Sequence, residues 1–427
     1  MDRNTIVGLV LIFVILIGFS YLTRPNEEQL KRIQEQRDSI TRVEAERMAL
    51  AVEQEKKDFE LSQQTDSLKI PSNAIFAQDS LKEEIITLEN NKIRLQLSTK
   101  GGRIVNVELK EYVTHDSMPL VLWKEDKSTF GLSFYAKNKQ INTEDYLFVP
   151  NTAETVLNAE KDVQTLSLKL FSEENKYVEF IYKLTPDSYM ADFSIRTYNM
   201  DDVIASNSSF LTLFWGVDMP QLEKSKDFEN RYTGVYYDFL SDDVENMSMN
   251  SNEKETLSTK IKWVAFKQQF FSSILIAQEA FTDVTLSSDI SNEPQYLKKV
   301  YAEIPLPYAG NSNEVYDMQF FFGPNSYPIL KEYGADIELP KLVNLGWKWV
   351  AWFNRYIVIP LFNFLENHVT GNYGLIILLL TLIIKLVLFP LTYKSYLSQA
   401  KMRVLKPQID EINKKYPKEK ALERQKA

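Results

Sequence analysis

The chain has 427 residues, which leaves room for two or three domains at about 150 residues per domain. Hydrophobic residues make up 44% of it and charged residues 25%, a balance that excludes both disorder throughout and a protein with most of its mass in lipid. There is no cysteine, and the two histidines are His115 and His368, which excludes a disulfide scaffold, a thiolate metal site and catalysis by several imidazoles. We therefore expect neither a metal nor another cofactor.

The net charge of −9 is unevenly distributed. Residues 391–427 carry ten lysines and arginines against four acidic residues, whereas the region before them is strongly acidic. A basic tail behind an acidic body indicates that the two parts face different partners or compartments.

The first predicted element is an apolar run at residues 6–22, which contains no charged side chain. As a helix rising about 1.5 Å per residue, this run spans roughly 26 Å and just crosses the hydrocarbon core of a membrane. A cleavable signal peptide is the alternative, because Gly18 and Ser20 resemble a small-residue cleavage site. We favour an uncleaved membrane anchor over residues 1–25, since the apolar run continues past that site.

Residues 26–84 are predicted to be a charged linker outside the membrane. Seventeen of the 35 residues from 26 to 60 are charged, and the apolar residues between them do not keep a heptad spacing. Such a composition is typical of a solvated helix or a disordered tether.

Residues 85–335 are predicted to be a large β-sandwich. Apolar and polar residues alternate over short runs, for example around Phe180, and Gly101 and Gly102 separate the first two runs as a hairpin turn would. This pattern, without a long helix, favours two packed sheets. The single histidine of the region, His115, lies in a polar stretch, and no nucleophile or phosphate-loop motif is present. We therefore expect no catalytic residue and no small-molecule substrate.

Residues 341–366 are predicted to form one amphipathic helix in the lipid headgroup region. They hold three of the six tryptophans, and basic residues recur at every seventh position. Aromatic side chains beside a stripe of cations suit that environment, whereas a helix packed on the β-domain is the alternative. The predicted anchoring residues are Trp347, Trp349, Trp352, Lys341, Lys348 and Arg355.

A second membrane-spanning helix is predicted at residues 373–391, with a buried helix of a soluble domain as the alternative. The basic residues directly after it indicate a cytoplasmic C-terminal side by the positive-inside rule. Two crossings then place the N-terminus in the cytoplasm as well, and residues 24–372 outside the plasma membrane.

Lys385 is the one charged residue within the second span. A charge near the middle of a bilayer costs at least about 2.5 kcal/mol by insertion scales. Thr381, four residues earlier, lies on the same helix face. The lysine side chain could extend to the cytoplasmic edge of the membrane instead. We favour a polar, water-accessible cavity within the membrane, lined by Thr381 and Lys385.

Residues 392–427 are predicted to be a basic cytoplasmic helical segment. Apolar residues at 402, 405, 409, 412 and 416 recur at intervals of three and four, which indicates a helix that packs against a partner helix. Because the sequence does not contain that partner, we expect the chain to be a piece of something longer. The predicted docking residues, for a ribosome or for anionic lipid, are Lys401, Arg403, Lys406, Lys414, Lys415 and Lys418.

These residues make the chain similar, over its whole length, to the YidC family of bacterial membrane-protein insertases. The most specific likeness is GNYGLIILLLTLIIKLVLFPLTYKSYLSQAKMRVLKPQI at residues 371–409, and shorter ones are STKGGRI at 98–104, WVAFKQQFF at 263–271 and FFGP at 321–324. The resemblance implies a periplasmic β-supersandwich, similar in fold to sugar mutarotases but without their chemistry. The expected fold is thus of mixed class: a transmembrane helix, this sandwich, an interfacial helix, a second transmembrane helix and the start of a cytoplasmic helical hairpin.

The sequence departs from the family pattern in two respects. Where the family has an arginine in a groove that faces the cytoplasm, this chain has Lys385, which keeps the charge and loses the planar fork that binds a carboxylate. Thr381 matches the family's groove threonine. The family pattern also continues with the rest of the hairpin and three more crossings, which this chain lacks.

The resemblance implies a non-enzymatic function, the insertion and folding of nascent inner-membrane proteins through a polar intramembrane groove. The partners it implies are nascent membrane proteins, the Sec translocon with its accessory subunits, the translating ribosome and anionic lipid. The implied location is the bacterial inner membrane, with several crossings. The alternative is a membrane-anchored periplasmic module that binds carbohydrate or a scaffold, and that functions without Lys385 and the basic tail.

Overall fold

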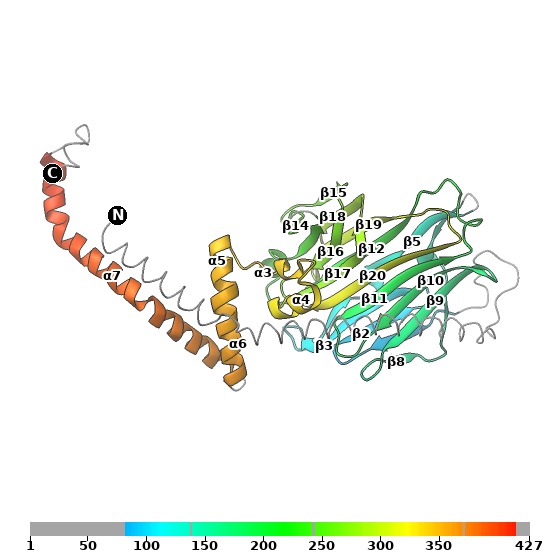
Figure 1. Cartoon of the computed structure of the whole chain (residues 1–427), viewed down its shortest axis with the longest axis horizontal. Helices are drawn as coiled ribbons and strands as arrows, with labels where there is room; N and C mark the ends of the chain where they lie inside the picture. Colours follow the sequence, from blue (N-terminus) through cyan, green and yellow to red (C-terminus); the bar gives the residue numbers. More distant parts are fainter. Residues whose placement is uncertain (1–81, 137–138, 241–243, 370–371, 416–427) are drawn as a thin grey trace, which may run out of the picture. The chain divides into compact units, whose positions relative to one another are not determined.

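The computed structural model describes residues 82–136, 139–240, 244–369 and 372–415 (Figure 1). The predicted anchor at residues 1–25, the linker up to residue 81 and the tail from residue 416 lie outside these ranges. The described residues form a large β-domain and, after it in sequence, a series of helices.

The strands of the β-domain belong to three sheets. The five-stranded sheet has the order β4 (Pro119–Trp123), β3 (Arg103–Val113), β2 (Ile93–Ser98), β1 (Ile85–Glu89) and β8 (Val156–Asn158). The nine-stranded sheet has the order β14 (Val244–Asn246), β13 (Gly234–Phe239), β16 (Ile261–Lys267), β17 (Phe271–Phe281), β20 (Asn313–Pro324), β11 (Met190–Tyr198), β10 (Lys176–Leu184), β9 (Gln164–Glu173) and β7 (Val149–Pro150). The six-stranded sheet has the order β15 (Glu253–Leu257), β18 (Val284–Ile290), β19 (Tyr296–Pro307), β12 (Phe210–Pro220), β5 (Ser128–Ala136) and β6 (Lys139–Asn142).

Most neighbouring strands pair antiparallel, and β8 pairs parallel to β1. Three short helical turns connect strands: η1 (Glu125–Lys127), η2 (Thr143–Asp145) and α3 (Lys226–Asn230). The β-sandwich predicted from the period-two pattern is confirmed, because the strands account for most of the predicted region.

The strand β10 shows how the alternating pattern is used. Val178, Phe180 and Tyr182 are fully buried, while Glu179 and Ile181 between them point to the other face and are half-buried. β10 pairs with β9 on one side and with β11 on the other, so a register shift of one residue would expose the whole apolar set.

The predicted glycine hairpin is also confirmed, between β2 and β3. Gly101 and Gly102 have φ angles of 80° and 62°, in the left-handed region that favours glycine. A Cβ atom on Gly102 would lie 2.9 Å from the ring of Phe148, so both the backbone conformation and the neighbouring side chain require glycine there.

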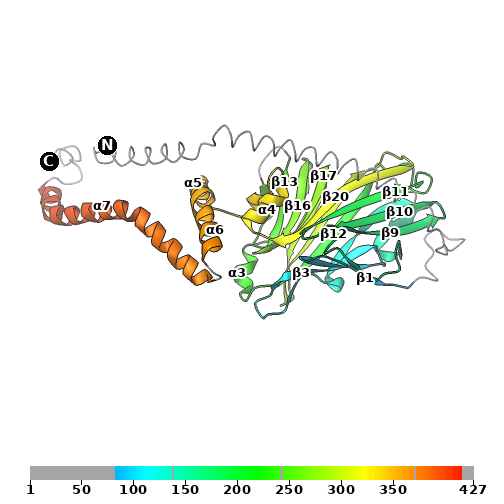
Figure 2. The ribbon, with the colours of Figure 1, turned by 60° about the horizontal axis from the view of Figure 1, so that its bottom comes forward.

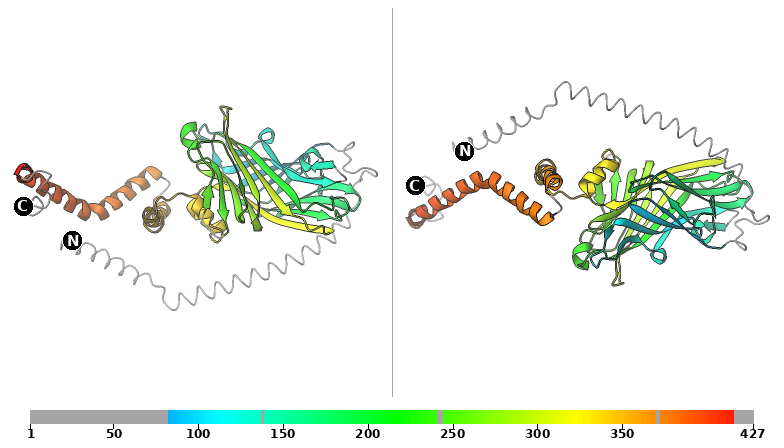
Figure 3. Two further views of the ribbon diagram at one scale, coloured as in Figure 1. Left: turned by 90° about the horizontal axis from the view of Figure 1, so that it is seen from above. Right: turned by 90° about the horizontal axis from the view of Figure 1, so that it is seen from below.

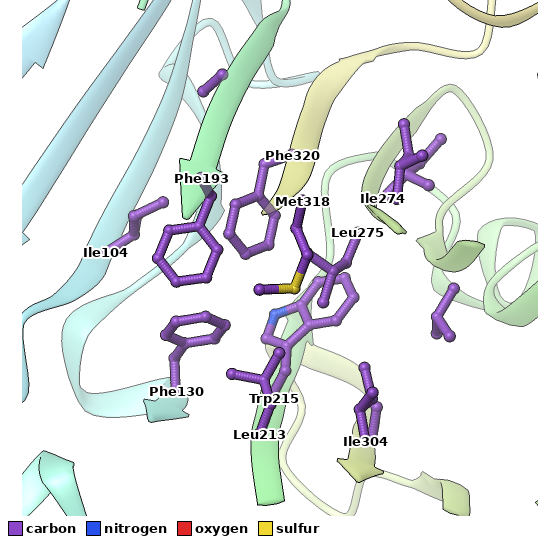
Figure 4. Packing of buried hydrophobic residues seen from close by; sticks show 14 of the residues in the cluster. Ile104, Phe130, Phe193, Leu213, Trp215, Ile274, Leu275, Ile304, Met318 and Phe320 are labelled. Atoms are coloured by element: carbon purple, nitrogen blue, oxygen red, sulfur yellow. The ribbon is translucent and has the colours of Figure 1, made fainter. Parts of the chain in front are cut away.

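An aromatic cluster fills the space between the six-stranded and the nine-stranded sheets (Figure 4). Phe130 on β5 and Trp215 on β12 meet Phe193 on β11 and Phe320 on β20. The ring centroids of Phe130 and Phe320 are 5.6 Å apart and those of Trp215 and Phe320 are 5.9 Å apart, both in edge-to-face geometry. Each such pair contributes about 0.5–1.5 kcal/mol beyond its buried area, so this cluster fixes how the two sheets pack.

The β-domain extends further along the chain than residue 335, the predicted boundary. After β20 come α4 (Tyr327–Gly334) and the short η3 (Leu339–Leu342), and Leu330, Leu339 and Leu342 belong to the buried core. The Nε1 atom of Trp263 donates a hydrogen bond of 2.7 Å to the carbonyl oxygen of Ile337, which ties this segment to β16.

The single helix predicted at residues 341–366 is wrong at its start. Lys341 lies in η3, and the helical run begins at Lys348 with α5 (Lys348–Phe353), continues as a π-helical turn, η4 (Asn354–Val358), and ends with α6 (Ile359–His368). Two physical causes are evident: Leu342 packs into the β-domain core, and Gly346 has a φ of 91°, which interrupts a helix. The π turn precedes Pro360, which has no N–H group for a regular helical hydrogen bond.

The last described element is α7 (Tyr373–Lys415), which contains 43 residues. The prediction divided this region at residue 391 into a membrane span and a separate tail, whereas the helix continues through Pro390 and Pro407. α7 changes direction along its length in both views of Figure 3, as proline within a helix predicts.

Candidate functional site

α7 is the one helix in the described part of the chain that is long and apolar enough to cross a membrane. The most apolar stretch of this helix is almost entirely exposed, because the rest of the protein buries 6% of it. Leu386, Val387 and Phe389 are among its exposed side chains. Because exposed apolar area costs about 25 cal/mol per Å² in water, this surface requires lipid or other apolar helices around it.

Thr381 and Lys385 are the polar side chains in the middle of this apolar surface. They are four residues apart and therefore lie on the same helix face, one turn from each other. Thr381 Oγ1 donates a hydrogen bond of 2.8 Å to the carbonyl oxygen of Ile377, so the helix itself satisfies the hydroxyl. The Lys385 side chain is exposed, and the structure records no hydrogen bond or ion pair between its ammonium and another described residue.

The position of Lys385 along α7 determines how far its charge lies from either end of the predicted span. Twelve residues separate it from Tyr373 and six from Leu391. At about 1.5 Å per residue these separations are about 18 Å and about 9 Å. The ammonium thus lies inside the apolar stretch, nearer to its C-terminal end.

The predicted anchoring residues do not all lie on one helix. Trp347 and Trp349, at the start of α5, expose 88% and 86% of their surface, and Trp352 is also exposed. Lys348 and Arg355 lie in the same helical run, whereas Lys341 is in η3 and forms an ion pair with Glu338. The guanidinium carbon of Arg355 is 5.6 Å from the centroid of the Tyr327 ring, a cation–π contact with α4.

The predicted docking residues lie in the second half of α7. Lys401, Arg403 and Lys406 are exposed there, beside exposed apolar side chains of Met402, Leu405 and Ile409. Lys414 and Lys415 are the last two residues of α7, and Lys418 falls outside the described residues. The cations therefore share one helix with Met402, Leu405 and Ile409, which we call the apolar seam.

The β-domain contains buried charges that the sequence analysis missed. Glu229 in α3 is 1% exposed, and its carboxylate accepts hydrogen bonds from the backbone N–H groups of Leu222 and Glu223. Burial nevertheless raises the pKa of Glu229 to about 7. Burial also lowers the pKa of Lys267 and of Lys298 to about 8.

No sequence signal distinguishes these three residues. Lys298 lies beside an exposed lysine, Lys299, and Glu229 lies in a stretch of mixed charge. The Nζ atom of Lys298 donates a hydrogen bond of 2.9 Å to the carbonyl oxygen of Met249, and the Nζ atom of Lys267 donates one of 3.3 Å to that of Tyr232. Each contact ties a strand residue to the backbone of a loop far away in the sequence. Within the described residues no group of three or more histidines and acidic residues could hold a metal ion.

The solved structures similar to the β-domain include mutarotase-like proteins. A galactose mutarotase-like protein from Lactobacillus casei is 13% identical with a TM-score of 0.36, and covers 56% of this chain and 99% of its own. A putative mutarotase from Salmonella typhimurium is 6% identical with a TM-score of 0.37, and covers 62% and 99%. At these TM-scores neither likeness bears on what the chain does.

Comparison by sequence is far more specific. A family model described as the YidC periplasmic domain matches residues 85–360, and one described as the 60Kd inner membrane protein matches residues 364–427. The membrane protein insertase YidC of Parabacteroides distasonis is 39% identical over 100% of this chain and 69% of its own length. That of Bacteroides fragilis is 37% identical over 98% and 67%.

The first family model ends and the second begins within α6, so together they cover the β-domain and α7. The relatives are membrane protein insertases, and insertion moves a polypeptide between two phases without a covalent change. The expectation of a non-enzymatic function is therefore confirmed. The chain belongs to the YidC family of membrane protein insertases.

Proposed function

We propose that α7 lines a polar, water-accessible groove through which a segment of a nascent membrane protein enters the bilayer. The observation that supports this proposal most strongly is Lys385, an exposed cation within the apolar stretch of α7. Thr381, one turn before it, adds a second polar position on the same side.

The energetic argument concerns the client. A charged residue near the centre of a bilayer costs about 2.5–3.5 kcal/mol by insertion scales, so a polar segment crosses hydrocarbon slowly. A groove that admits water to the level of Lys385 shortens the apolar path. The lysine ammonium attracts an acidic client residue as a point charge, without the two-point geometry that an arginine offers.

The proposed topology has both ends of the chain in the cytoplasm and the β-domain outside the inner membrane. The basic residues at the end of α7 favour a cytoplasmic location there. The second crossing would be residues 6–22, which lie outside the described residues. In this arrangement α5 and α6 lie in the outer headgroup region, where the exposed Trp347 and Trp349 act as anchors.

We propose nascent membrane proteins as clients and, in addition, the ribosome, anionic lipid and the Sec translocon as partners. The exposed cations Lys401, Arg403 and Lys406 suit ribosomal RNA or anionic lipid, because both present phosphates. The apolar seam beside them suits a partner helix. The Sec translocon and its accessory subunits are proposed as partners because the family resemblance implies insertion either alone or together with the translocon.

The test is an insertion assay with two clients that differ only in the segment they translocate, which is acidic in one and apolar in the other. In cells depleted of their own insertase, Lys385→Leu should reduce insertion of the acidic client roughly tenfold, which corresponds to about 1.4 kcal/mol of lost attraction. Lys385→Arg should retain it.

Lys394→Leu is the matched control, since Lys394 is an exposed lysine on the same helix beyond Pro390. This variant should insert both clients as the unchanged protein does. Equal insertion of the acidic client by the Lys385→Leu and Lys394→Leu variants would refute the groove.

A further inference from the structure

Three turns at one end of the β-domain expose large apolar side chains. The turn between β3 and β4 carries Val113 and Met118, the α3 region carries Phe228 and Tyr232, and the turn between β16 and β17 carries Phe270; these five residues are called the apolar tips. We propose that the apolar tips insert into the headgroup region of the outer face of the membrane, so that the β-domain rests on lipid.

Hydrogen bonds hold the three turns next to one another. The backbone N–H of His115 donates to the carbonyl oxygen of Leu222 at 3.2 Å, which joins the first turn to the α3 region. The Nε2 atom of Gln268 donates to the carbonyl oxygen of Pro220 at 2.6 Å, which joins the third turn to the end of β12. The apolar tips therefore form one surface.

The turns are also fixed from within the domain. Glu229, next to Phe228 in α3, is buried and accepts hydrogen bonds from the backbone N–H groups of Leu222 and Glu223. The Nζ atom of Lys267 donates to the carbonyl oxygen of Tyr232 at 3.3 Å. These buried polar contacts hold the loops in a conformation that leaves their apolar side chains exposed, and a group of such side chains on one surface is typical of an interaction site.

The exit of the chain toward the membrane lies at the same end of the domain. The backbone N–H of Asn325, the first residue after β20, donates to the carbonyl oxygen of Phe270 at 2.7 Å. Two residues later Tyr327 begins α4, and its ring is the one that Arg355 of the π-helical turn contacts. α3 and α4 accordingly lie at one end of the β-domain in Figure 2.

Lipid is the partner that fits this surface, for two reasons. The chain leaves the β-domain toward α5 and α6 from the end that carries the tips, so the inference rests on the proposed headgroup location of those helices. The charges at the surface of the α3 region also nearly cancel: the exposed Lys224 and Arg231 and the half-buried Lys226 stand against the exposed Asp227 and the half-buried Glu223. Apolar insertion rather than charge therefore supplies the attraction.

The experiment measures the depth of single fluorescent labels in the full chain, reconstituted into lipid nanodiscs. The chain has no cysteine, so one introduced cysteine carries the only label. Asp227→Cys places the label beside Phe228 and leaves the apolar tips intact, Ser312→Cys places it in the loop between β19 and β20, and Trp349→Cys places it on α5. Quenching by lipids that carry a quencher near the headgroup then reports contact.

The Ser312 label is the matched control because it lies at the opposite end of the sandwich. β12 leads from Phe210, next to that loop, to Pro220 at the tips, and eleven residues at about 3.3 Å each span about 36 Å. We expect the labels at 227 and 349 to be quenched at least about twofold more strongly than the label at 312, as for a surface held in the interface.

A second set of variants shows whether the apolar side chains are responsible. Phe228→Ser, Tyr232→Ser and Phe270→Ser together should abolish quenching at 227, whereas Phe210→Ser should leave it unchanged; Phe210 and Phe270 are both 51% exposed. If the label at 349 is quenched and that at 227 is not, the inference is wrong while the interfacial location of α5 stands. If neither is quenched, the proposed location of α5 fails as well.

Discussion

The buried carboxyl group of Glu229 makes the stability of the β-domain depend on pH. Its pKa is raised from an ordinary value of 4.5 to about 7, because burial disfavours the charged form. A raised pKa means that the folded state binds the proton more tightly than the unfolded state does. The stabilisation is therefore fully present below about pH 4.5 and is lost as the pH rises through about 7.

The size of the effect follows from the shift. A change from 4.5 to about 7 corresponds to about 3 kcal/mol, at about 1.4 kcal/mol per pH unit. Glu229→Gln removes the titrating group, so between pH 5 and pH 8, which covers most of this change, the variant should lose about 2.5 kcal/mol less stability than the unchanged protein. The amide of the variant pairs differently with the Leu222 and Glu223 N–H groups, but that cost does not change with pH and leaves the predicted difference between pH 5 and pH 8 unaffected.

The assay is urea unfolding of the chain in detergent at four pH values from 5 to 8. Trp123, Trp215 and Trp263 are buried in the β-domain, so tryptophan circular dichroism in the near ultraviolet follows its unfolding. Glu154→Gln, a change at an exposed carboxylate, is the control and should follow the unchanged protein. If Glu229→Gln has the same pH profile as the control, the raised pKa is wrong.

Three further predictions concern packing and docking. Phe320→Ala, in the aromatic cluster, should cost about 3–5 kcal/mol in urea unfolding, whereas Phe210→Ala at the surface should cost less than about 1 kcal/mol; equal costs would contradict the packing described. Gly102→Ala should lower the thermal unfolding temperature by at least about 4 °C, since a left-handed φ and a 2.9 Å approach to Phe148 both disfavour a Cβ atom; an unchanged temperature would show that the hairpin relaxes freely. Changing Lys414, Lys415 and Lys418 to Glu should weaken co-sedimentation with translating ribosomes in a salt-dependent way and leave the unfolding of the β-domain unchanged; unaltered co-sedimentation at low salt would leave the basic tail as a topology signal alone.

The β-sandwich could be predicted because its strands obey a simple rule. Alternation with a period of two, as in β10, reports directly which side chains face the core, and a pair of glycines marks a turn. The membrane-crossing potential of α7 could be predicted for a similar reason, since length and composition alone define it.

The helix boundaries were harder to predict because they depend on contacts across the fold. The seven-residue spacing of Lys341, Lys348 and Arg355 suggested one helix, but Leu342 is used by the β-domain core and Gly346 adopts a left-handed conformation. Pro390 suggested a boundary, yet a proline within a long helix bends it without ending it.

The buried charges and the apolar tips could not be predicted from spacing at all. Glu229 and Lys298 are ordinary charged residues in sequence, and only the tertiary structure removes them from water. Phe228 and Phe270 are 42 residues apart, and the hydrogen bonds of the intervening turns bring them to the same end of the domain.

The central claim is that the face of α7 with Thr381 and Lys385 receives the client. The most direct measurement is photo-crosslinking to a nascent membrane protein arrested on the ribosome, from a photoreactive residue at position 385 or at position 387. Residue 387 is exposed and lies about 200° around the helix from residue 385. The proposal predicts strong crosslinks to the client from 385 and weak ones from 387; crosslinks of equal strength from both positions, or none from 385, would contradict it.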